Sequence, residues 1–160
     1  MKKLLSFMLL VGAAVVFYRS FVGGPPRNFE SPVFGEIRVN AQIQGRDIEM
    51  ALFVRTADDN DCKARAHRSW EAALKKCPTC ELQPTKCQAQ LPARYARLFN
   101  DEPIPSTYLS AAAGTADERD RRLVVYGLTD AEGAATCEMI RGMLLESFHG
   151  SAHCVKASGG

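Results

Sequence analysis

The chain has 160 residues, of which 46 % are hydrophobic and 24 % are charged, and this composition is typical of a folded domain rather than a disordered one. The formal net charge is +2, but three of the 20 basic residues lie in the first 22 positions, which contain no acid. The rest of the chain contains 17 basic and 18 acidic side chains. A near-neutral body lacks the positive field of a nucleic-acid-binding protein, and we expect no nucleic-acid partner.

The first 22 residues have the pattern of a membrane anchor. Lys2 and Lys3 precede a mainly apolar run over residues 4–22, and 19 helical residues reach about 28 Å, close to the roughly 30 Å of a bilayer core. No good peptidase site follows the run, so we favour an uncleaved signal anchor over a secretion signal that is cleaved. The lysines place the N-terminus in the cytoplasm. We therefore expect a single-pass protein of the bacterial inner membrane, with its body in the periplasm.

A linker, one folded domain and a short tail follow the anchor. Residues 23–34 begin with Gly-Gly-Pro-Pro, which ends any helix and stiffens the chain. Residues 35–157 carry the patterns of one extracytoplasmic domain, and residues 158–160 are expected to fray.

A β-hairpin opens this domain. Apolar and polar residues alternate over 36–44, which predicts a half-buried strand, and Gly45 supplies a turn. Residues 48–54 alternate again, but Ala51 and Phe53 make the second face of this strand apolar too. The second strand is therefore expected to be the more central one.

A helix is predicted to follow the acidic cluster Asp58-Asp59-Asn60-Asp61, which suits the N-terminus of a helix. The cluster lacks the turn glycine and the bidentate glutamate of a calcium loop. One apolar stripe at helical spacing runs from Cys62 through Trp70 to Cys77, and Pro78 stops the helix.

Residues 78–105 form a long, proline-rich connector. Within it, residues 91–99 predict one short helix with Pro92 in its first turn. Long connectors in compact domains are disproportionately functional, so this segment is a candidate contact surface for a partner.

The second half repeats the pattern of the first. Residues 106–113 and 122–128 predict a hairpin, a capping box at Thr129 and Glu132 opens a helix, and residues 152–156 predict a last strand. A shift of 71 residues lays Leu52-Phe53-Val54 on Leu123-Val124-Val125. This suggests a diverged duplication, although any two amphipathic helices after a strand can be aligned in this way.

These elements predict an α+β domain with two layers, in which two helices cover one face of a mainly antiparallel sheet. The arrangement is either ββα-ββα-β or ferredoxin-like. The ferredoxin-like order has one difficulty. The first strand of that fold has a neighbouring strand on both sides, so the strand at residues 48–54 could not also pair with its hairpin partner at residues 37–43.

The six cysteines form an even set downstream of an export signal, which predicts disulfides. Cys62 and Cys77 would lie about 22 Å apart along one helix, whereas a disulfide needs Cα atoms within about 7 Å. We therefore favour Cys62–Cys87 and Cys137–Cys154, with Cys77 and Cys80 either paired or free. The alternative joins Cys87 to Cys77 or Cys80.

Two chemistries compete with a structural role for these cysteines. Cys77-Pro78-Thr79-Cys80 has the spacing of a thiol–disulfide exchange motif, but it closes a helix, whose C-terminal dipole would raise the thiol pKa. Cys77, Cys80 and Cys87 would suit zinc with one histidine added. His67 lies about 15 Å from Cys77 along the helix, so His149 or His153 would be needed.

The sequence contains no phosphate-binding glycine loop and no nucleophile elbow, so we predict no catalytic residue and no cofactor. The favoured function is a non-enzymatic, membrane-anchored binding or accessory domain of the bacterial envelope, with another envelope protein as its partner. Thiol–disulfide exchange through Cys77 and Cys80 is the first alternative, and a zinc-binding module is the second.

Overall fold

The computed structural model describes residues 30–74, 77 and 79–158, and for residues 67–74 it describes the backbone alone. The predicted anchor at residues 1–22 lies outside these ranges, as does most of the predicted linker. Among the described residues, no helix is long and apolar enough to cross a membrane. The first strand, β1 (Val33–Ile43), begins two residues before the predicted start of the domain.

β1 and β2 (Arg46–Thr56) form the predicted hairpin, with Val39 opposite Met50. Gln44 and Gly45 join the strands, and both have a positive φ (53° and 77°). Two consecutive residues with positive φ give the turn whose twist matches that of the flanking strands.

The described strands form one antiparallel sheet in the order β3-β1-β2-β6-β5-β7, with β4 also paired to β1. The predicted α+β class and antiparallel sheet are therefore confirmed. The remaining strands are β3 (Cys80–Leu82), β4 (Lys86–Gln88), β5 (Tyr108–Ala112), β6 (Arg121–Tyr126) and β7 (Ser151–Val155).

The strand order is not ferredoxin-like. β7 pairs with the outer edge of β5, and β1 lies beside β2 at the position that the closing strand of that fold would need. Because β1 takes the place beside β2, the last strand, β7, has to pair at the other edge, with β5.

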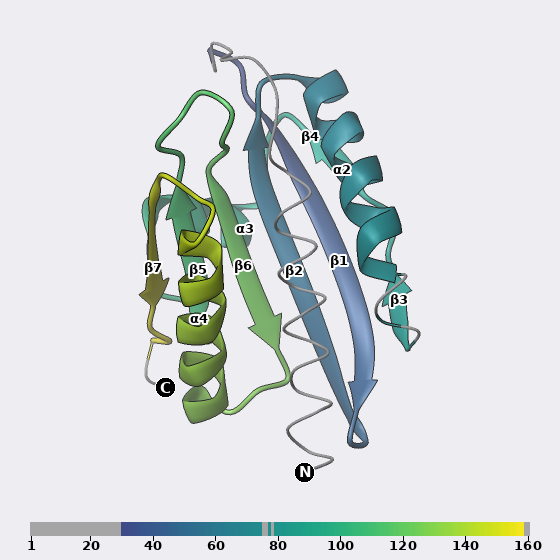
Figure 1. Ribbon diagram of the computed structural model, residues 1–160, viewed down its shortest axis with the longest axis vertical. Helices are drawn as coiled ribbons and strands as arrows, with labels where there is room; N and C mark the ends of the chain where they lie inside the picture. The colour runs from purple at the N-terminus through teal and green to yellow at the C-terminus, as the bar shows by residue number, and fades with distance from the viewer. Residues whose placement is uncertain (1–29, 75–76, 78, 159–160) are drawn as a thin grey trace.

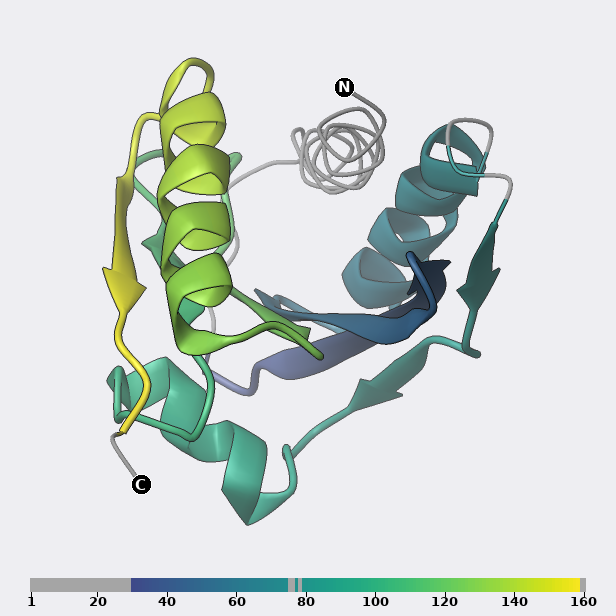
Figure 2. The same cartoon turned by 90° about the horizontal axis from the view of Figure 1, so that it is seen from below.

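Two helices lie on one face of the sheet, as predicted: α2 (Asp59–Leu74) stands over the β1 side and α4 (Asp130–Leu145) over the β5 side, apart from each other (Figures 1 and 2). Their apolar sides pack on β-strand residues that include Ile37, Leu52 and Leu123. α4 begins with the predicted capping box, in which the Thr129 hydroxyl accepts from the Glu132 amide and the Glu132 carboxylate accepts from the Thr129 amide. This satisfies two backbone donors at the start of the helix.

The two-layer prediction is incomplete, because the connector adds a partial layer on the opposite face (Figure 2). It forms α3 (Ala93–Ala96) and the 3-10 helix η1 (Arg97–Asn100), which cover a second core that includes Phe53 and Val124. The rings of Phe53 and Tyr95 lie 4.6 Å apart between centroids. The second apolar face of β2 is what this layer buries, since apolar area left in water costs about 25 cal/mol per Å².

The three disulfides are Cys62–Cys87, Cys77–Cys80 and Cys137–Cys154, with Cα–Cα distances of 6.1, 5.4 and 6.0 Å. This is the favoured set of the sequence analysis. Two of the bridges join a front-face helix to an edge of the sheet, because Cys87 lies on β4 and Cys154 lies on β7.

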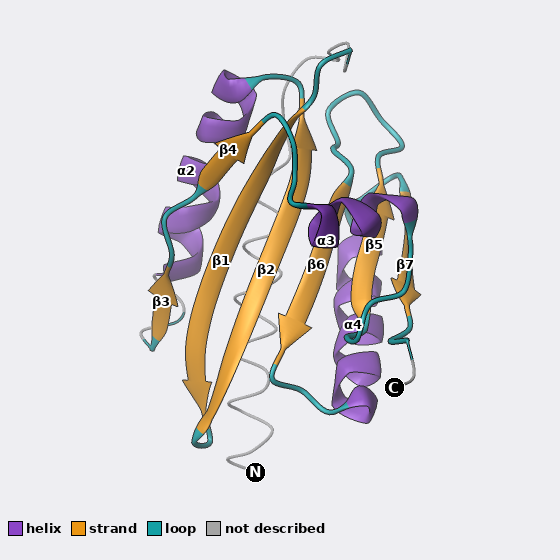
Figure 3. Cartoon of the chain, turned by 180° about the vertical axis from the view of Figure 1, so that it is seen from behind, coloured by secondary structure: helices purple, strands orange, loops and turns teal. Residues whose placement is uncertain are grey.

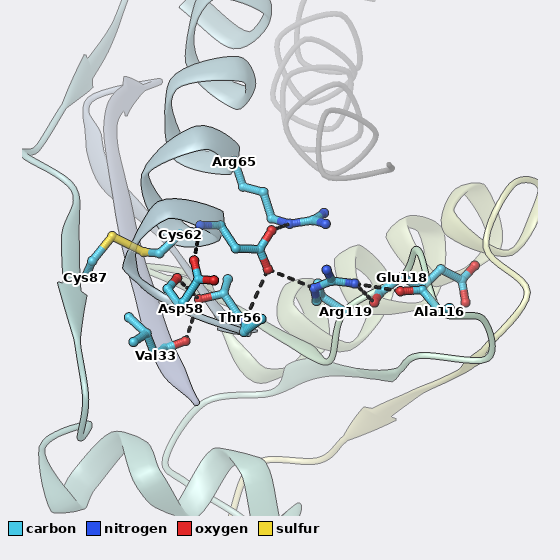
Figure 4. Close-up of polar contacts among 11 residues, drawn as sticks. Val33, Thr56, Asp58, Cys62, Arg65, Cys87, Ala116, Glu118 and Arg119 are labelled. Carbon is cyan, nitrogen blue, oxygen red and sulfur yellow. Dashed lines mark hydrogen bonds and ion pairs between the residues drawn. A yellow bond between two sulfur atoms is a disulfide. The ribbon is translucent and has the colours of Figure 1, made fainter. Parts of the chain in front are cut away.

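A buried ion cluster joins the two halves of the domain at the start of α2 (Figure 4). The Asp61 carboxylate accepts from Arg65 Nε at 2.7 Å and from Arg119 Nε at 3.1 Å, and the two arginine side chains are 0 % and 1 % exposed. The Asp61 amide donates to the Asp58 carboxylate, so the acidic cluster caps the helix as predicted. Asp61 therefore holds the first half, through α2, against the loop that precedes β6.

We predict that Asp61→Asn destabilises the domain by about 3 kcal/mol at pH 7, because it leaves two buried guanidinium groups without their shared carboxylate. Burial alone would raise the pKa of Asp61, but hydrogen bonds from Arg65 and from the Ala57 amide outweigh it and hold the pKa below its ordinary value. A lowered pKa means that the carboxylate stabilises the fold fully above about pH 4 and loses this effect as the pH falls through the folded-state pKa. Urea unfolding at pH 7 and pH 3 should therefore show a large difference between variant and wild type that shrinks in acid.

The matched control is Asp59→Asn, which removes an exposed carboxylate from the same first turn of α2, where it pairs with exposed Lys63. Its effect on the free energy of unfolding should be much smaller. Equal effects of the two variants would contradict the role given to Asp61.

Candidate functional site

The structure does not give Cys77 and Cys80 the surroundings of a thiol-exchange centre. Cys77 follows the C-terminal end of α2 and is buried, while Cys80 opens the short strand β3. The Cys80 amide donates to the Cys77 carbonyl at 3.1 Å, so the bridge closes a tight turn. No described helix begins at Cys77 to lower its thiol pKa.

The residues of the zinc alternative are not brought together. Cys87 is bonded to Cys62 and not placed with Cys77 and Cys80. His153 lies on β7, at the opposite end of the sheet from β3, and the side chain of His67 lies outside the described residues. Within the described ranges, no group of three potential ligands could hold a metal ion.

The feature that could bind a partner is on the rear face of the sheet (Figure 3). α3 and η1 cross only part of this face, and lengths of β1, β2 and β6 extend beyond them. The strand register places Glu81, Asn40, Glu49 and Tyr126 in one row across β3, β1, β2 and β6. Paired residues on adjacent strands point to the same face, so these four side chains form a polar floor.

Two hollows lie over this floor and share Glu49 and Tyr126. One has a volume of about 510 Å³ and the other of about 530 Å³. Because they share a wall, we treat them as one feature and call it the groove. Its lining residues are Arg38, Asn40, Ala41, Gln42, Asp47, Ile48, Glu49, Thr79, Glu81, Arg94, Tyr95, Arg97, Ile104, Pro105, Ser106 and Tyr126.

The connector supplies both ends of the groove. Thr79 and Glu81 stand at the β3 end, and the lining residues between Arg94 and Pro105 stand at the other end. Sequence length alone singled out this segment, but nothing in the sequence connected it with the outward-facing side chains of β1 and β2.

Arg38 fixes the wall between the sheet and α3. Its guanidinium donates to Glu36 at 2.6 Å, to Glu49, and to the Tyr95 hydroxyl at 2.5 Å. It also stacks 5.0 Å from the Tyr95 ring centroid. Burial would lower the pKa of Arg38, but the hydrogen bond to Glu36 and the charge of Glu49 have a larger effect in the opposite direction. The pKa is therefore raised and the group stays charged. These four contacts fix the Arg38 side chain between the sheet and α3.

Tyr126 is held close to β2 by the residue that comes after it in the chain. Gly127 has a φ of 86°, and a Cβ atom there would lie 2.3 Å from the Asp47 carbonyl oxygen. Only glycine allows this approach of the two chains. Burial raises the pKa of Tyr126, so its hydroxyl is protonated at neutral pH and can donate a hydrogen bond into the groove.

The two ends of the groove carry opposite charge. At the α3 end, Arg97 pairs with Glu102, whereas no described carboxylate pairs with the exposed Arg94. In the hollow that reaches β3, Asp47 on β2 accepts from the Gln42 amide at 2.9 Å, and no described cation pairs with Asp47 or with Glu81 on β3.

We predict that Arg38→Met destabilises the domain by about 3 kcal/mol, because it keeps most of the apolar stem but leaves the buried Glu36 carboxylate without its closest cation. The double variant Glu36→Gln/Arg38→Met should recover a large part of this loss, since it removes both charges. Urea unfolding of wild type, the two single variants and the double variant gives the coupling energy of the pair, which we expect to exceed about 1 kcal/mol. Simple additivity would show that Glu36 does not hold Arg38 in place.

Comparison with known proteins gives no relative. No protein-family model matches the chain, and neither a curated protein nor a solved structure does. A function for the groove therefore has to be inferred from its own residues.

Proposed function

We propose that this protein is a membrane-anchored binding module of the bacterial envelope and that the groove is its binding surface. The observation that carries the proposal is the Arg38 wall. A polar patch on a sheet is an ordinary protein surface. Here, however, Glu36, Glu49 and Tyr95 fix the Arg38 guanidinium, and this gives the groove a defined shape. Such preorganisation lowers the entropic cost of binding.

The proposal is non-enzymatic because of what lines the groove. The described lining residues include no cysteine or lysine, and no histidine that could activate the hydroxyl groups of Thr79 and Ser106. They include amide, carboxylate, guanidinium and phenol groups, which recognise polar ligands by hydrogen bonds and charge.

The proposed location is the periplasmic side of the inner membrane. The apolar run at residues 4–22 after two lysines supports an anchor of that orientation. A set of six cysteines that is fully paired in the fold is consistent with an oxidising compartment.

The location makes a prediction about thiols. In a Gram-negative host quenched rapidly with acid, the full-length protein should offer no cysteine to a thiol-reactive polymer, whereas a variant lacking residues 4–22 should stay in the cytoplasm and offer all six. The readout is the number of mass increments on a denaturing gel. Six reactive cysteines in the full-length protein would refute the proposed location.

The binding surface makes a second prediction. A photoreactive phenylalanine analogue in place of Tyr126, at the centre of the groove, should give a defined cross-linked product in intact cells. The same analogue in place of Glu138, exposed on α4 at the opposite face, is the matched control and should not give that product. Equal cross-linking from both positions would mean that the groove is not the contact surface.

A further inference from the structure

We infer that the ligand of the groove is a short, extended peptide that carries a free carboxylate at one end and an amino group at the other. This inference deepens the proposed function and rests on it. It uses the length of the groove and the separation of its unpaired charges, two features that the assignment of a binding surface did not need.

The polar row sets a lower limit on the length of the ligand. It runs from Glu81 on β3 to Tyr126 on β6, which is three strand spacings. At about 4.8 Å each, these spacings give roughly 14 Å, which about four residues of an extended chain span at about 3.4 Å per residue. The second hollow continues beyond Tyr126 to Arg94 and Ile104, so the ligand has at least about four residues.

The charges select the two ends of that segment. Of the three arginines that line the α3 end, Arg38 is held by Glu36 and Glu49, and Arg97 by Glu102. Arg94 is left, and its guanidinium lies 4.5 Å from the ring centroid of Tyr95, on the rim of the hollow. An exposed guanidinium on an aromatic platform is suited to a carboxylate, which it can bind with two parallel hydrogen bonds.

The β3 end selects the opposite group. Asp47 on β2 and Glu81 on β3 line the hollow that reaches β3, and the described part of the chain gives neither of them a cation. A hollow lined by two such carboxylates favours a ligand ammonium, which has three donors. Placing the peptide the other way round would set like charges against each other at both ends, so the charges also fix its direction.

The middle of the groove is suited to a peptide backbone. Asn40 lies between Glu81 and Glu49 in the row, and its amide can donate and accept at the same time. The Tyr126 hydroxyl adds a further donor on the other side of Glu49. The hollow at the α3 end also has an apolar lining from Tyr95, Ile104 and Pro105, which suits an apolar side chain such as that of alanine next to the ligand carboxylate.

The experiment uses the full-length protein in lipid nanodiscs and the tetrapeptide Lys-Ala-Ala-Ala with free termini, with binding measured by equilibrium dialysis. The free-acid peptide should bind about tenfold more tightly than its C-terminal amide, the difference expected for one charge-assisted pair. It should also bind about tenfold more tightly than N-acetylated Gln-Ala-Ala-Ala, which lacks both positive charges.

Two sets of variants assign these differences to the two ends. Arg94→Gln should reduce the preference for the free acid to about twofold or less, while the matched variant Arg97→Gln, at a neighbouring arginine already paired with Glu102, should retain it. The double variant Asp47→Asn/Glu81→Gln should lose the preference for the lysine peptide and keep the preference for the free acid. All of these side chains are exposed, so the fold is expected to tolerate the changes.

Failure of this inference can be told from failure of the proposed function. A cross-linked partner at Tyr126 together with no peptide binding, or with binding that Arg94→Gln does not alter, would overturn the ligand class and leave the binding surface standing. Binding of the neutral oligosaccharide cellotetraose that equals or exceeds peptide binding would do the same in favour of a glycan. If Tyr126 gives no cross-linked product and none of the probes binds, both the ligand class and the binding surface are overturned.

Discussion

The groove depends on one constraint: the connector must pass from the front face of the sheet to the rear face around the free edge of β1. α2 ends on the front, and α3 lies on the rear (Figure 2). Between them the chain pairs twice with β1, through β3 and β4, and the Cys62–Cys87 bridge ties β4 to the first turn of α2. The closed loop spans 25 residues, a length for which a disulfide stabilises a fold by about 3.5 kcal/mol in the chain-entropy model.

Through this path around β1, two disulfides determine the shape of the groove. The Cys77–Cys80 turn delivers Glu81 to the end of the polar row, and the Cys62–Cys87 bridge fixes the point from which the chain runs on to Tyr95. Tyr95 packs on Phe53 and accepts a hydrogen bond from Arg38. The position of the connector therefore determines the position of the wall of the groove. The disulfides therefore fix the frame of the groove that we propose as a binding surface.

Local patterns in the sequence predicted much of the fold. Alternation gave the hairpins, the Thr129 capping box gave the start of α4, and helix length excluded a Cys62–Cys77 bridge. β3 and β4, with three residues each, are too short for any periodic signal, and they exist because β1 offers an unpaired edge. The short helix predicted at residues 91–99 is present as α3 and η1, but its position on the rear face was missed, although the apolar residues Ala51 and Phe53 on the second face of β2 were the signal for it.

The groove itself could not be predicted from the sequence. Asn40, Glu49 and Tyr126 read as ordinary solvent-facing positions of separate strands, and only the register brings them into one row. Long-range register is a tertiary property: it depends on which residues each strand must bury on the opposite face, summed over all strands. A sequence pattern that identifies the buried face of a strand leaves the neighbours of the exposed face undetermined.

The likeness between the two halves shows where the domain is specialised. α2 and α4 have 16 residues each and stand 71 positions apart, and Leu52 pairs with Leu123, its counterpart at the same shift. A local two-fold axis through that pair is what two joined copies of one unit produce, so the sheet register favours a diverged duplication.

Each half also ends in the same way, with an edge strand after the helix that pairs with the first strand of its own hairpin, and with a helix-to-edge disulfide. The halves differ beyond that edge strand. After β4 the chain continues into α3 and η1, which cover part of the rear faces of the two central strands around Phe53 and Val124. On β6, Arg122 donates to the Leu98 carbonyl and fixes this layer to the second half. The polar row from Glu81 to Tyr126 lies outside the covered part. The helical segment of the connector therefore supplies the wall that turns a flat sheet surface into a groove.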